Sequence, residues 1–467
     1  MNLVRPMSRA FSTKGPGTRQ GRDVWNMLKE EFDILRTGRL TPMEPEVPAE
    51  TDVLIIGGGI MGNSAAYWLK QRNPKGLTCT VVERDPTYTR SSTMLSVGGI
   101  RHQFRCPENV QMSLFTSEFL RNIREHLSVL DMDPPDVQFN PQGYMFLASE
   151  EQVDQLKENV TMQNELGAKV HLLTKNRLAQ KFPWLNLEGV AAGSYGIEGE
   201  GWFDPYLLTR AFKQKNLSLG VRYVTGEVVG FDTKDEELIV GTGTRTCKYL
   251  KGAQIRNQTG EVHSLNFCFT VNCAGAWASE VAAMAGIGQG INELSVPLPV
   301  EPRKRYVYVV HCADGPGLEA PLTIDNSGMY FRREGIAGNY LCGSSPEEDE
   351  EPEVNTLNVD YEYYNDCVWP LLAHRIPKFE NSKLRSAWAG FYDYNTVDQN
   401  CILGNHPYHR NFFFMNGFSG HGIQQAVAAG RALMELTLDN GYKTIDLSRL
   451  EFNRFITCEP CVEKCIV

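Results

Sequence analysis

Apolar positions first form a regular pattern at residue 53. Val53–Ile56 is a continuous apolar run, which is typical of a strand buried on both faces of a parallel sheet. Residues 57–62 read GGGIMG, and the apolar positions within 65–69 then predict a helix that ends before Pro74. A second apolar run predicts a strand over 78–82. The order strand, glycine-rich turn, helix, strand is that of a βαβ unit.

The glycine-rich turn has the spacing of a dinucleotide-binding fingerprint. Gly57 allows the tight turn from strand to helix, Gly59 lets the backbone approach a pyrophosphate, and Gly62 lets the helix pack closely on the strand. The first helical residues, Ile60 and Met61, are expected beside the phosphates, because a helix N-terminus offers free N–H groups and a positive dipole end.

An acidic residue follows the second predicted strand. Glu83 lies about 20 residues beyond Gly62, where an acid can accept hydrogen bonds from ribose hydroxyls. Its charge would repel a 2′-phosphate, which disfavours NADP. The alternative is a glycine-rich turn that binds no ligand. The strand before, the helix after and the acid at this distance favour the dinucleotide site.

Other patterns predict elements further along the chain. Residues 138–147 predict a pair of strands joined by a turn at 141–143, and residues 303–310 predict a strand. Asp204-Pro205 predicts a helix start, with Asp as the N-cap and Pro at the first helical position. The apolar positions within 423–434 predict a helix near the C-terminus.

Composition and charge narrow the possible functions. The chain has 467 residues, of which 42% are hydrophobic and 22% charged, and its formal net charge is −10. These values are ordinary for a globular protein. The negative balance disfavours nucleic-acid binding, which needs a basic surface. No window of about 18 residues is free of charged or polar interruption, so we predict no transmembrane span.

The N-terminal residues have the composition of a targeting segment. Residues 1–22 contain five basic residues and several hydroxyl residues, and the first acid is Asp23. This composition is typical of a mitochondrial presequence, and Arg9 stands before a possible cleavage point between Phe11 and Ser12. The alternative is a basic disordered tail. Residues 23–50 are expected to form a linker, so we expect a protein of the mitochondrial matrix, at most peripheral on the inner membrane.

The twelve cysteines are mostly scattered in apolar runs, which suits a reducing compartment. Cys458, Cys461 and Cys465 form a cluster at the C-terminus. A three-cysteine metal site is one interpretation, but no nearby His completes the usual four ligands. We therefore favour free thiols and predict no metal.

Four stretches beyond the fingerprint carry a family resemblance. Hydroxyls and paired glycines at 91–101 suit ribitol, phosphate and a flat ring, and residues 226–229, 271–277 and 417–424 add further glycine-bearing strand ends and a helix start. Together these motifs make residues 52 to about 438 resemble the flavoprotein superfamily of D-amino-acid oxidase, sarcosine oxidase and dimethylglycine dehydrogenase.

The resemblance implies FAD as the cofactor. It implies contacts from Gly57, Gly59, Ile60, Met61, Gly62, Glu83, Arg84, Ser92, Thr93, Gly98, Gly99, Arg101, Val228, Ala274, Gly275, Trp277, Gly420, His421, Gly422, Ile423 and Gln424. In the superfamily the last helix directs its N-terminus at the pyrimidine edge of the flavin, where its dipole stabilises negative charge. No second strand–GxGxxG–helix unit occurs, which disfavours an NADH-linked flavin reductase.

The resemblance also implies an α/β fold in which two domains interleave. A Rossmann-like FAD-binding domain with a parallel sheet is expected over 51–136, 201–296 and 386–452. A second, substrate domain with a mainly antiparallel sheet is expected over 137–200 and 297–385. The cysteine-containing tail is expected over 453–467.

The chain departs from the superfamily at functional positions. Leu95 and Gly390 stand where relatives attach FAD covalently, so we expect non-covalent FAD. Gln424 and, by a looser alignment, Leu341 stand where sarcosine oxidase has a substrate-binding and an oxygen-activating lysine. The loss of a buried cation near the flavin argues against a fast oxidase.

Several polar residues fall on segments expected near the flavin. The catalytic candidates are Arg101, Arg333, Tyr392 and His421, with Arg305, Arg332, Tyr306 and Tyr330 on the same segments. An arginine could hold a carboxylate with two hydrogen bonds. The alternative is structural for most of them: a solvated turn at 332–333, sheet packing for Tyr306, and support of the flavin loop for His421. The acidic segment 346–352 is expected to be a solvated loop.

Two functions remain open. Within the superfamily the motifs most resemble a mitochondrial branch that assists assembly of respiratory complex I, which implies complex I subunits or assembly intermediates as partners. The stretches that carry this likeness are 83–85, 95–100, 201–205, 300–309 and 386–396. The alternative is an active dehydrogenase of a small amine or N-methyl amino acid, of the sarcosine or dimethylglycine type, that passes electrons from FAD to a carrier protein. The lost lysines favour the first, and whether the chain is an enzyme stays open.

Overall fold

The computed structural model describes residues 46–240 and 243–464. Its central strand is β1 (Glu50–Ile56), which contains the expected run 53–56 and is buried from Thr51 onward except at Asp52. β1 pairs in parallel with β2 (Cys79–Glu83) on one side and with β11 (Val262–Asn272) on the other. The strand that was expected over 78–82 is therefore present, shifted by one residue.

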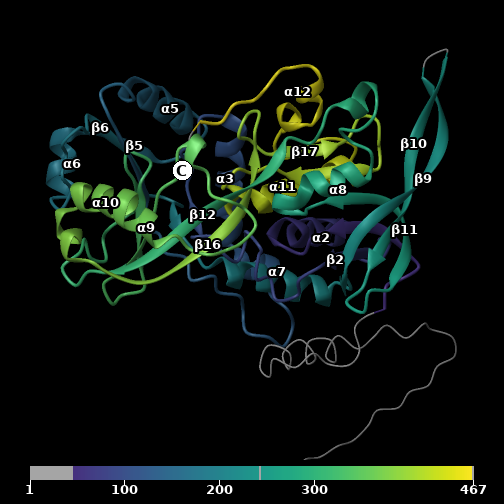
Figure 1. Cartoon of the computed structure of the whole chain (residues 1–467), viewed down its shortest axis with the longest axis horizontal. Coiled ribbons are helices and arrows are strands. Elements are labelled where there is room, and N and C mark those ends of the chain that lie inside the picture. The colour runs from purple at the N-terminus through teal and green to yellow at the C-terminus, as the bar shows by residue number, and fades with distance from the viewer. Residues whose placement is uncertain (1–45, 241–242, 465–467) are drawn as a thin grey trace, which may run out of the picture. The chain divides into compact units, whose positions relative to one another are not determined.

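The first sheet extends outward from these three strands. Its order is β17-β18-β11-β1-β2-β8, with β17 (Ile402–Asn405), β18 (Phe412–Asn416) and β8 (Arg222–Thr225). β9 (Glu227–Val240) and β10 (Gly243–Arg256) form an antiparallel pair. β10 pairs with the N-terminal half of β11, and the pair extends from the sheet as an arm (Figure 1). The sheet is parallel from β18 to β8 and antiparallel where β17 and β10 join it.

Helix α2 (Ile60–Arg72) follows β1 directly and ends where Pro74 was expected to stop it. It is buried along nearly its whole length because α11 (Gly422–Leu438) lies beside it (Figure 1). The contact is close: the Trp68 ring N–H donates to the Val427 carbonyl at 2.9 Å. Two remote parts of the chain therefore join on one face of the first sheet.

The second sheet has the order β16-β12-β15-β14-β13-β4-β6-β5. Its strands are β4 (Tyr144–Ala148), β5 (Val170–Thr174), β6 (Ala192–Gly196), β12 (Val300–His311), β13 (Leu322–Ile324), β14 (Tyr330–Glu334), β15 (Asn339–Gly343) and β16 (Lys383–Asn395). All neighbours are antiparallel except β13 and β4. The expected fold class, a parallel-containing sheet and a mainly antiparallel sheet that alternate along the chain, is confirmed.

Two local expectations differ from the structure. Residues 138–147 contribute one strand of the second sheet, β4, rather than a pair, because 138–143 turn away and only Asn140 forms a bridge, to Trp202. The expected boundary at 385 falls inside β16, which continues along β12 as far as Asn395.

The remaining elements cover the two sheets or connect them. The helix that begins after the Asp204 cap is α7 (Pro205–Ser218), and Asp204 accepts a hydrogen bond from the Leu207 N–H as expected of an N-cap. The others are α3 (Pro107–Arg121), α4 (Ile123–Leu127), α5 (Val153–Glu165), α6 (Lys175–Lys181), α8 (Ala278–Met284), α9 (Tyr361–Tyr363), α10 (Trp369–Arg375), α12 (Asn453–Ile456) and the small sheet of β3 (Gly99–Ile100) and β7 (Gly201–Trp202). None of the helices in 46–240 and 243–464 is long and apolar enough to cross a membrane.

Backbone segments approach closely where β1 passes into α2. A Cβ atom added at Gly62 would lie 2.0 Å from the Gly57 carbonyl oxygen and 3.1 Å from the Ile55 side chain. Gly57 itself has φ +104°, and a Cβ there would lie 2.4 Å from the Cys273 carbonyl oxygen. The tight turn and the close packing that the glycine spacing predicts are both present.

Gly62→Ala tests this close approach. The methyl group would meet a backbone atom that cannot rotate away, so the turn or the helix must shift. We expect the free energy of unfolding to fall by at least about 2 kcal/mol, as measured by urea unfolding. Gly230→Ala is the matched control, because a Cβ there would be no closer than 3.6 Å to the flexible Gln254 side chain. Equal stability of the two variants would contradict the packing argument.

Candidate functional site

A large cavity lies at the carboxyl ends of β1, β2 and β11, which is where open α/β sheets bind ligands. Its opposite wall comes from the second sheet, through residues of β4, β12, β13, β14 and β16. Most of the residues expected to bind FAD line it, namely Gly57, Gly59, Ile60, Met61, Glu83, Arg84, Ser92, Thr93, Gly99, Arg101, Val228, Ala274, Gly275, Trp277, Gly420, His421, Gly422, Ile423 and Gln424. The fold thus gathers five separate stretches of sequence around one space.

Glu83 stands at the end of β2 and holds the glycine turn. Its Oε2 accepts a hydrogen bond from the Gly58 N–H at 2.7 Å, and its Oε1 accepts one from the Asp85 N–H at 2.9 Å. Burial raises the pKa of the Glu83 carboxyl above its usual value, while these two backbone hydrogen bonds oppose the rise. The acid therefore positions the turn and faces the cavity, where a ribose hydroxyl could reach it.

The N-terminus of α2 faces the same end of the cavity. No acidic residue stands in its first turn, and its N-cap is Gly59, which has no side chain to cover the free N–H groups. Thr93 and Ser91 lie next to it: a Cβ at Gly59 would be 3.2 Å and 3.8 Å from their hydroxyl oxygens. Thr93 Oγ1 accepts a hydrogen bond from the Ile60 N–H at 3.2 Å. Helix amides and hydroxyls thus converge as an anion site requires.

Arginine and aromatic side chains stack at the side of this region. The Arg84 guanidinium lies 4.1 Å from the centre of the Trp277 ring, and Arg90 lies 5.2 Å from the same ring. Trp277 belongs to a 3₁₀ turn, η1 (Gly275–Trp277), just after β11. The stretch with Ala274 and Gly275 therefore faces the cavity with backbone and one large flat side chain.

The N-terminus of α11 closes the far end of the cavity, as expected. The chain reaches it through Gly417 (φ +69°), Ser419 (φ +47°) and Gly420 (φ +91°), conformations that favour glycine at two of the three positions. The first turn of α11 carries no acid. Its dipole and free amides therefore point at the cavity, as at the N-terminus of α2.

Arg101, His421 and Gln424 are brought into one cluster at this end. The Arg101 N–H donates to Gln424 Oε1 at 2.9 Å, and an Arg101 guanidinium nitrogen lies 2.9 Å from His421 Nε2. The Arg101 guanidinium also lies over the rings of Phe104 and Phe146, at 4.5 and 4.9 Å from their centres. Arg101 is 1% exposed. The cluster supplies a buried positive charge held by aromatic faces.

The second sheet presents tyrosines and one arginine to the cavity. Tyr144, Tyr306, Tyr330 and Tyr392 all line it, together with Arg305. Arg305 is already engaged: its two terminal nitrogens donate to the two carboxylate oxygens of Glu351, each at 2.8 Å. Arg303 binds the same carboxylate at 3.0 Å. The segment 346–352 is therefore more than the solvated loop that its charge suggested, because Glu351 neutralises two arginines beside the cavity.

Four predicted residues, Gly62, Gly98, Arg332 and Arg333, lie outside the cavity lining. Gly62 and Gly98 stand behind it, where a Cβ would meet a backbone carbonyl oxygen at 2.0 Å in each case. Arg333 was a catalytic candidate and does not face the cavity: it binds the Gly335 carbonyl and Asn140 Oδ1, the latter at 3.3 Å, and lies against Trp202. Its position on β14 directs it away from the side that Tyr330 presents.

The C-terminal cysteines do not form a metal site within the described residues. Cys458 is exposed and Cys461 is buried, whereas Cys465 lies outside the described residues. No group of three His, Cys, Asp or Glu side chains in 46–240 and 243–464 is placed to hold a metal ion.

Glu200 lies behind the cavity lining, and sequence reasoning missed its burial. It is fully buried beneath the Arg101 segment, where its Oε2 accepts a hydrogen bond from Gln103 Nε2 at 2.8 Å and its Oε1 lies 3.7 Å from His102 Nδ1. Burial raises its pKa to about 8. Nothing in the local sequence signals this, because the burial arises from the packing of three distant segments.

Glu200 predicts a pH dependence of stability. Its folded pKa of about 8 exceeds the ordinary value of 4.5, so the folded protein holds a proton that the unfolded chain releases. Its contribution to stability is complete below about pH 4.5 and is lost as the pH rises to about 8. Glu200→Gln keeps the neutral shape without the titration. We expect the unfolding free energy of the variant minus that of wild type to increase by up to about 1.4 kcal/mol per pH unit across this window.

Urea unfolding of both proteins at a series of pH values measures that difference, and it cancels the titration of every other group. A difference that does not change with pH would mean that the Glu200 carboxyl ionises in its usual range.

Comparison with known proteins agrees with this geometry. Residues 52–436 match the family described as FAD dependent oxidoreductase. The chain is 53% identical over 451 residues to the FAD-dependent oxidoreductase domain-containing protein 1 of Xenopus laevis, which covers 94% of this chain and 90% of the relative. It is also 23% identical over 450 residues to the mitochondrial sarcosine dehydrogenase of Mus musculus, covering 94% of this chain and 45% of that one.

The solved structures give the same result. The crystal structure of L-proline dehydrogenase from P. horikoshii superposes with a TM-score of 0.72 at 27% identity, over 89% of this chain and 100% of that one. The glycine turn, the two helix N-termini and the two interleaved sheets therefore have a common origin: the chain belongs to the family of FAD-dependent oxidoreductases.

Proposed function

We propose that this protein holds FAD without a covalent bond and uses it as a dehydrogenase that oxidises a C–N bond of a small amine or amino acid. The observation that carries the proposal is the continuous cavity from the N-terminus of α2 to the N-terminus of α11. FAD carries a charged pyrophosphate between its two nucleotide halves and an electron-accepting ring at one end, so it fits a cavity in which one positive helix end can meet the pyrophosphate and the other can meet the ring.

Each part of the chain has a definite task in this proposal. The glycine turn, Thr93 and Ser91 hold phosphate, and Glu83 holds ribose. Bound FAD supplies two-electron redox chemistry. Arg101 offers a buried positive charge beside the start of α11, and the tyrosines of the second sheet exclude water from the substrate side. Proline and sarcosine, the substrates that the relatives' names state, are small secondary amines with a carboxylate that such a charge would attract.

The non-covalent linkage is supported by the two positions at which relatives attach FAD. Leu95 and Gly390 both line the cavity and stand opposite one another: a Cβ at Gly390 would lie 3.0 Å from the Leu95 Cβ. The Trp388 ring N–H donates to the Leu95 carbonyl at 2.9 Å and fixes the two segments together. Neither residue can form a bond to the flavin.

A dehydrogenase is favoured over an oxidase by the missing lysine rather than by a lack of positive charge, because Arg101 lines the cavity. No lysine is among the described residues that line it, and position 424 carries the Gln that binds Arg101. Leu341 is buried in β15 away from the lining, so it gives no information about the lysine that the looser alignment placed there.

Non-covalent binding predicts that FAD is released when the protein unfolds. After acid precipitation of the purified protein we expect the yellow colour in the supernatant and a colourless pellet, because no bond joins flavin to chain. Absorbance of the two fractions measures this. Flavin retained in a washed pellet would show a tether elsewhere.

Gly59→Val tests where the pyrophosphate lies. The side chain would occupy the space between the start of α2 and the hydroxyls of Ser91 and Thr93, so we expect flavin content to fall at least about ten-fold, equivalent to about 1.4 kcal/mol of binding. The ratio of flavin to protein absorbance measures it. Gly230→Val is the matched control on β9, outside the cavity, and should keep the flavin content of wild type. Full flavin in the Gly59 variant would refute the assignment of the turn.

The redox activity is tested by anaerobic titration with proline, sarcosine and dimethylglycine. We expect at least one of these amines to bleach the visible flavin band, with little consumption of oxygen when air is admitted. If none bleaches the flavin while dithionite does, the cofactor is present without this activity.

A second function rests on a different observation. Arg305 is paired with Glu351 and Gln424 with Arg101, so much of the polar surface facing a substrate is already bound within the protein. This favours FAD as a structural ligand in a protein that acts by binding partners. Its basic leader and its motifs resemble the mitochondrial branch described above, so we propose that it assists assembly of complex I in the matrix through contacts with complex I subunits.

Cells that lack the protein test this second function. We expect reduced amounts of assembled complex I, restored by wild type and by Gly230→Val but not by Gly59→Val. Rescue by a stable, flavin-free Gly59→Val protein would show that FAD is dispensable for assembly. Normal complex I in the null cells would contradict the assembly role and leave amine oxidation as the function.

A further inference from the structure

The C-terminal segment is bound to the start of α3 by a buried carboxylate. Glu463 is fully buried, and its two oxygens accept hydrogen bonds from the backbone N–H groups of Arg105 and Cys106 and from Asn109 Nδ2, at 2.9–3.2 Å. Cys106 is the N-cap of α3. A negative charge at a helix N-terminus is stabilised by the dipole and by the free amides.

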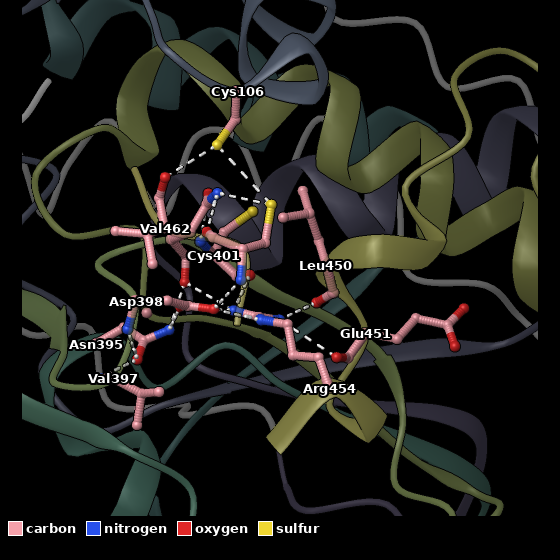
Figure 2. A network of polar contacts seen from close by, with 12 residues as sticks. Cys106, Asn395, Val397, Asp398, Cys401, Leu450, Glu451, Arg454 and Val462 are labelled. Atoms are coloured by element: carbon pink, nitrogen blue, oxygen red, sulfur yellow. Dashed lines mark hydrogen bonds and ion pairs between the residues drawn. The ribbon is translucent and has the colours of Figure 1, made fainter. Parts of the chain in front are cut away.

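The same segment is bound on its other side to the turn that follows β16. Asp398 accepts hydrogen bonds from the Cys461 N–H at 2.9 Å and from the Arg454 guanidinium at 2.7 and 3.0 Å (Figure 2). The Glu463 N–H donates to the Asp398 carbonyl at 3.0 Å. Residues 461–463 therefore bridge α3 and the turn at 395–401, both of which continue into segments that line the cavity.

Two thiols meet within this bridge. The Cys106 and Cys461 sulfur atoms are 3.8 Å apart, and Cys106 Sγ lies 3.3 Å from the Val462 carbonyl oxygen (Figure 2). Cys106 is 7% and Cys461 3% exposed. A disulfide requires about 2.05 Å between its sulfurs, so the two sulfur atoms must approach by less than 2 Å from their present 3.8 Å.

The surroundings make the two thiols unequal. Contact with the Cys106 thiol, supported by the Arg449 and Arg454 guanidiniums, lowers the pKa of Cys461. Contact with Cys461 and burial raise the pKa of Cys106. Since the thiolate is the reactive form, these shifts favour Cys461 as the attacking thiol and Cys106 as the resolving thiol.

We propose that Cys106 and Cys461 form a reversible disulfide that fixes the C-terminal segment to the start of α3 when the protein meets peroxide. Cys461 Sγ attacks one oxygen of hydrogen peroxide and the O–O bond breaks. A sulfenic acid forms on Cys461, and the other peroxide oxygen leaves as water. Cys106 Sγ then attacks that sulfur, the S–S bond forms, and the sulfenic oxygen leaves as a second water. Two thiols are oxidised by two electrons and one peroxide is reduced; a small dithiol reverses the step.

The bond would act on the candidate site through a short connection. Arg101, which lines the cavity, is followed by only four residues before Cys106. Without the bond, residues 457–464 are held by hydrogen bonds and by the packing of Cys461 in the core, and they open by local unfolding. With it, the backbone from Arg101 to α3 is covalently restrained by the tail. The inference does not depend on which proposed function is correct.

The purified full-length flavoprotein tests the proposal directly. It is treated with a small excess of hydrogen peroxide, the remaining thiols are blocked, and the unreduced digest is analysed by mass spectrometry. We expect a peptide pair that joins Cys106 to Cys461, which disappears after dithiothreitol. The measurement uses the wild-type chain, so it does not depend on the folding of a variant.

Control variants test whether the cross-link depends on the closeness of the Cys106 and Cys461 thiols or on the exposure of a thiol. Cys461→Ser should abolish the cross-linked pair, whereas Cys401→Ser, which removes a neighbouring buried thiol, and Cys458→Ser, which removes an exposed one, should keep it. Oxidation should also slow hydrogen exchange at the backbone N–H groups of 105–110 and 459–463 by about ten-fold in wild type, because tail release is no longer a route of opening.

Other outcomes would overturn the inference. Cross-links through Cys458, sulfinic acid on Cys461 without a bond to Cys106, or no modification of either thiol before the protein unfolds would each show that the pair does not act as a disulfide site. If hydrogen exchange in the peroxide-treated Cys461→Ser variant slows as much as in wild type, another thiol causes the slowing.

Discussion

The architecture depends on a place where three stretches of backbone come together without room for a side chain. The end of β1, the start of α2 and the end of β11 meet at Gly57 and Gly62, with the Cys273 carbonyl pressed against the turn. Because nothing larger than hydrogen fits there, the helix starts directly over the strand ends and its amides face open space. The same restriction that removes side chains from this point creates the anion-binding end of the cavity.

The opposite wall follows a different principle, in which charged groups are buried and paired. Arg101 rests on aromatic rings and on His421, and Arg305 shares Glu351 with Arg303. Buried charges are costly unless they are paired, so these pairings fix side-chain positions strongly. One end of the cavity is therefore built from backbone and the other from side-chain networks.

The sequence predicted the first of these ends far better than the second. The β1–α2–β2 unit depends on neighbours in the chain, so apolar runs and glycine spacing predicted it closely. The direction of Arg333 depends on the register of β14 against β15 and β13, and the partner of Glu351 depends on β12, neither of which is local. The strand pair expected at 138–147 was wrong for the same reason: β4 finds its partners in β6 and in the distant β13. The burial of Cys461 and Glu463 likewise arises only from tertiary contacts.

The order of strands in the first sheet has a consequence for how the chain must be made. β1 begins at residue 50 but lies next to β11, which ends at residue 272, and β11 in turn needs β18 at residues 412–416. A chain that emerges from its N-terminus therefore carries exposed parallel strand edges until most of its length is available, and such long-range pairing is slow. During synthesis the half-finished sheet exposes apolar surface that can aggregate, so this protein should rely on chaperones that bind extended apolar segments.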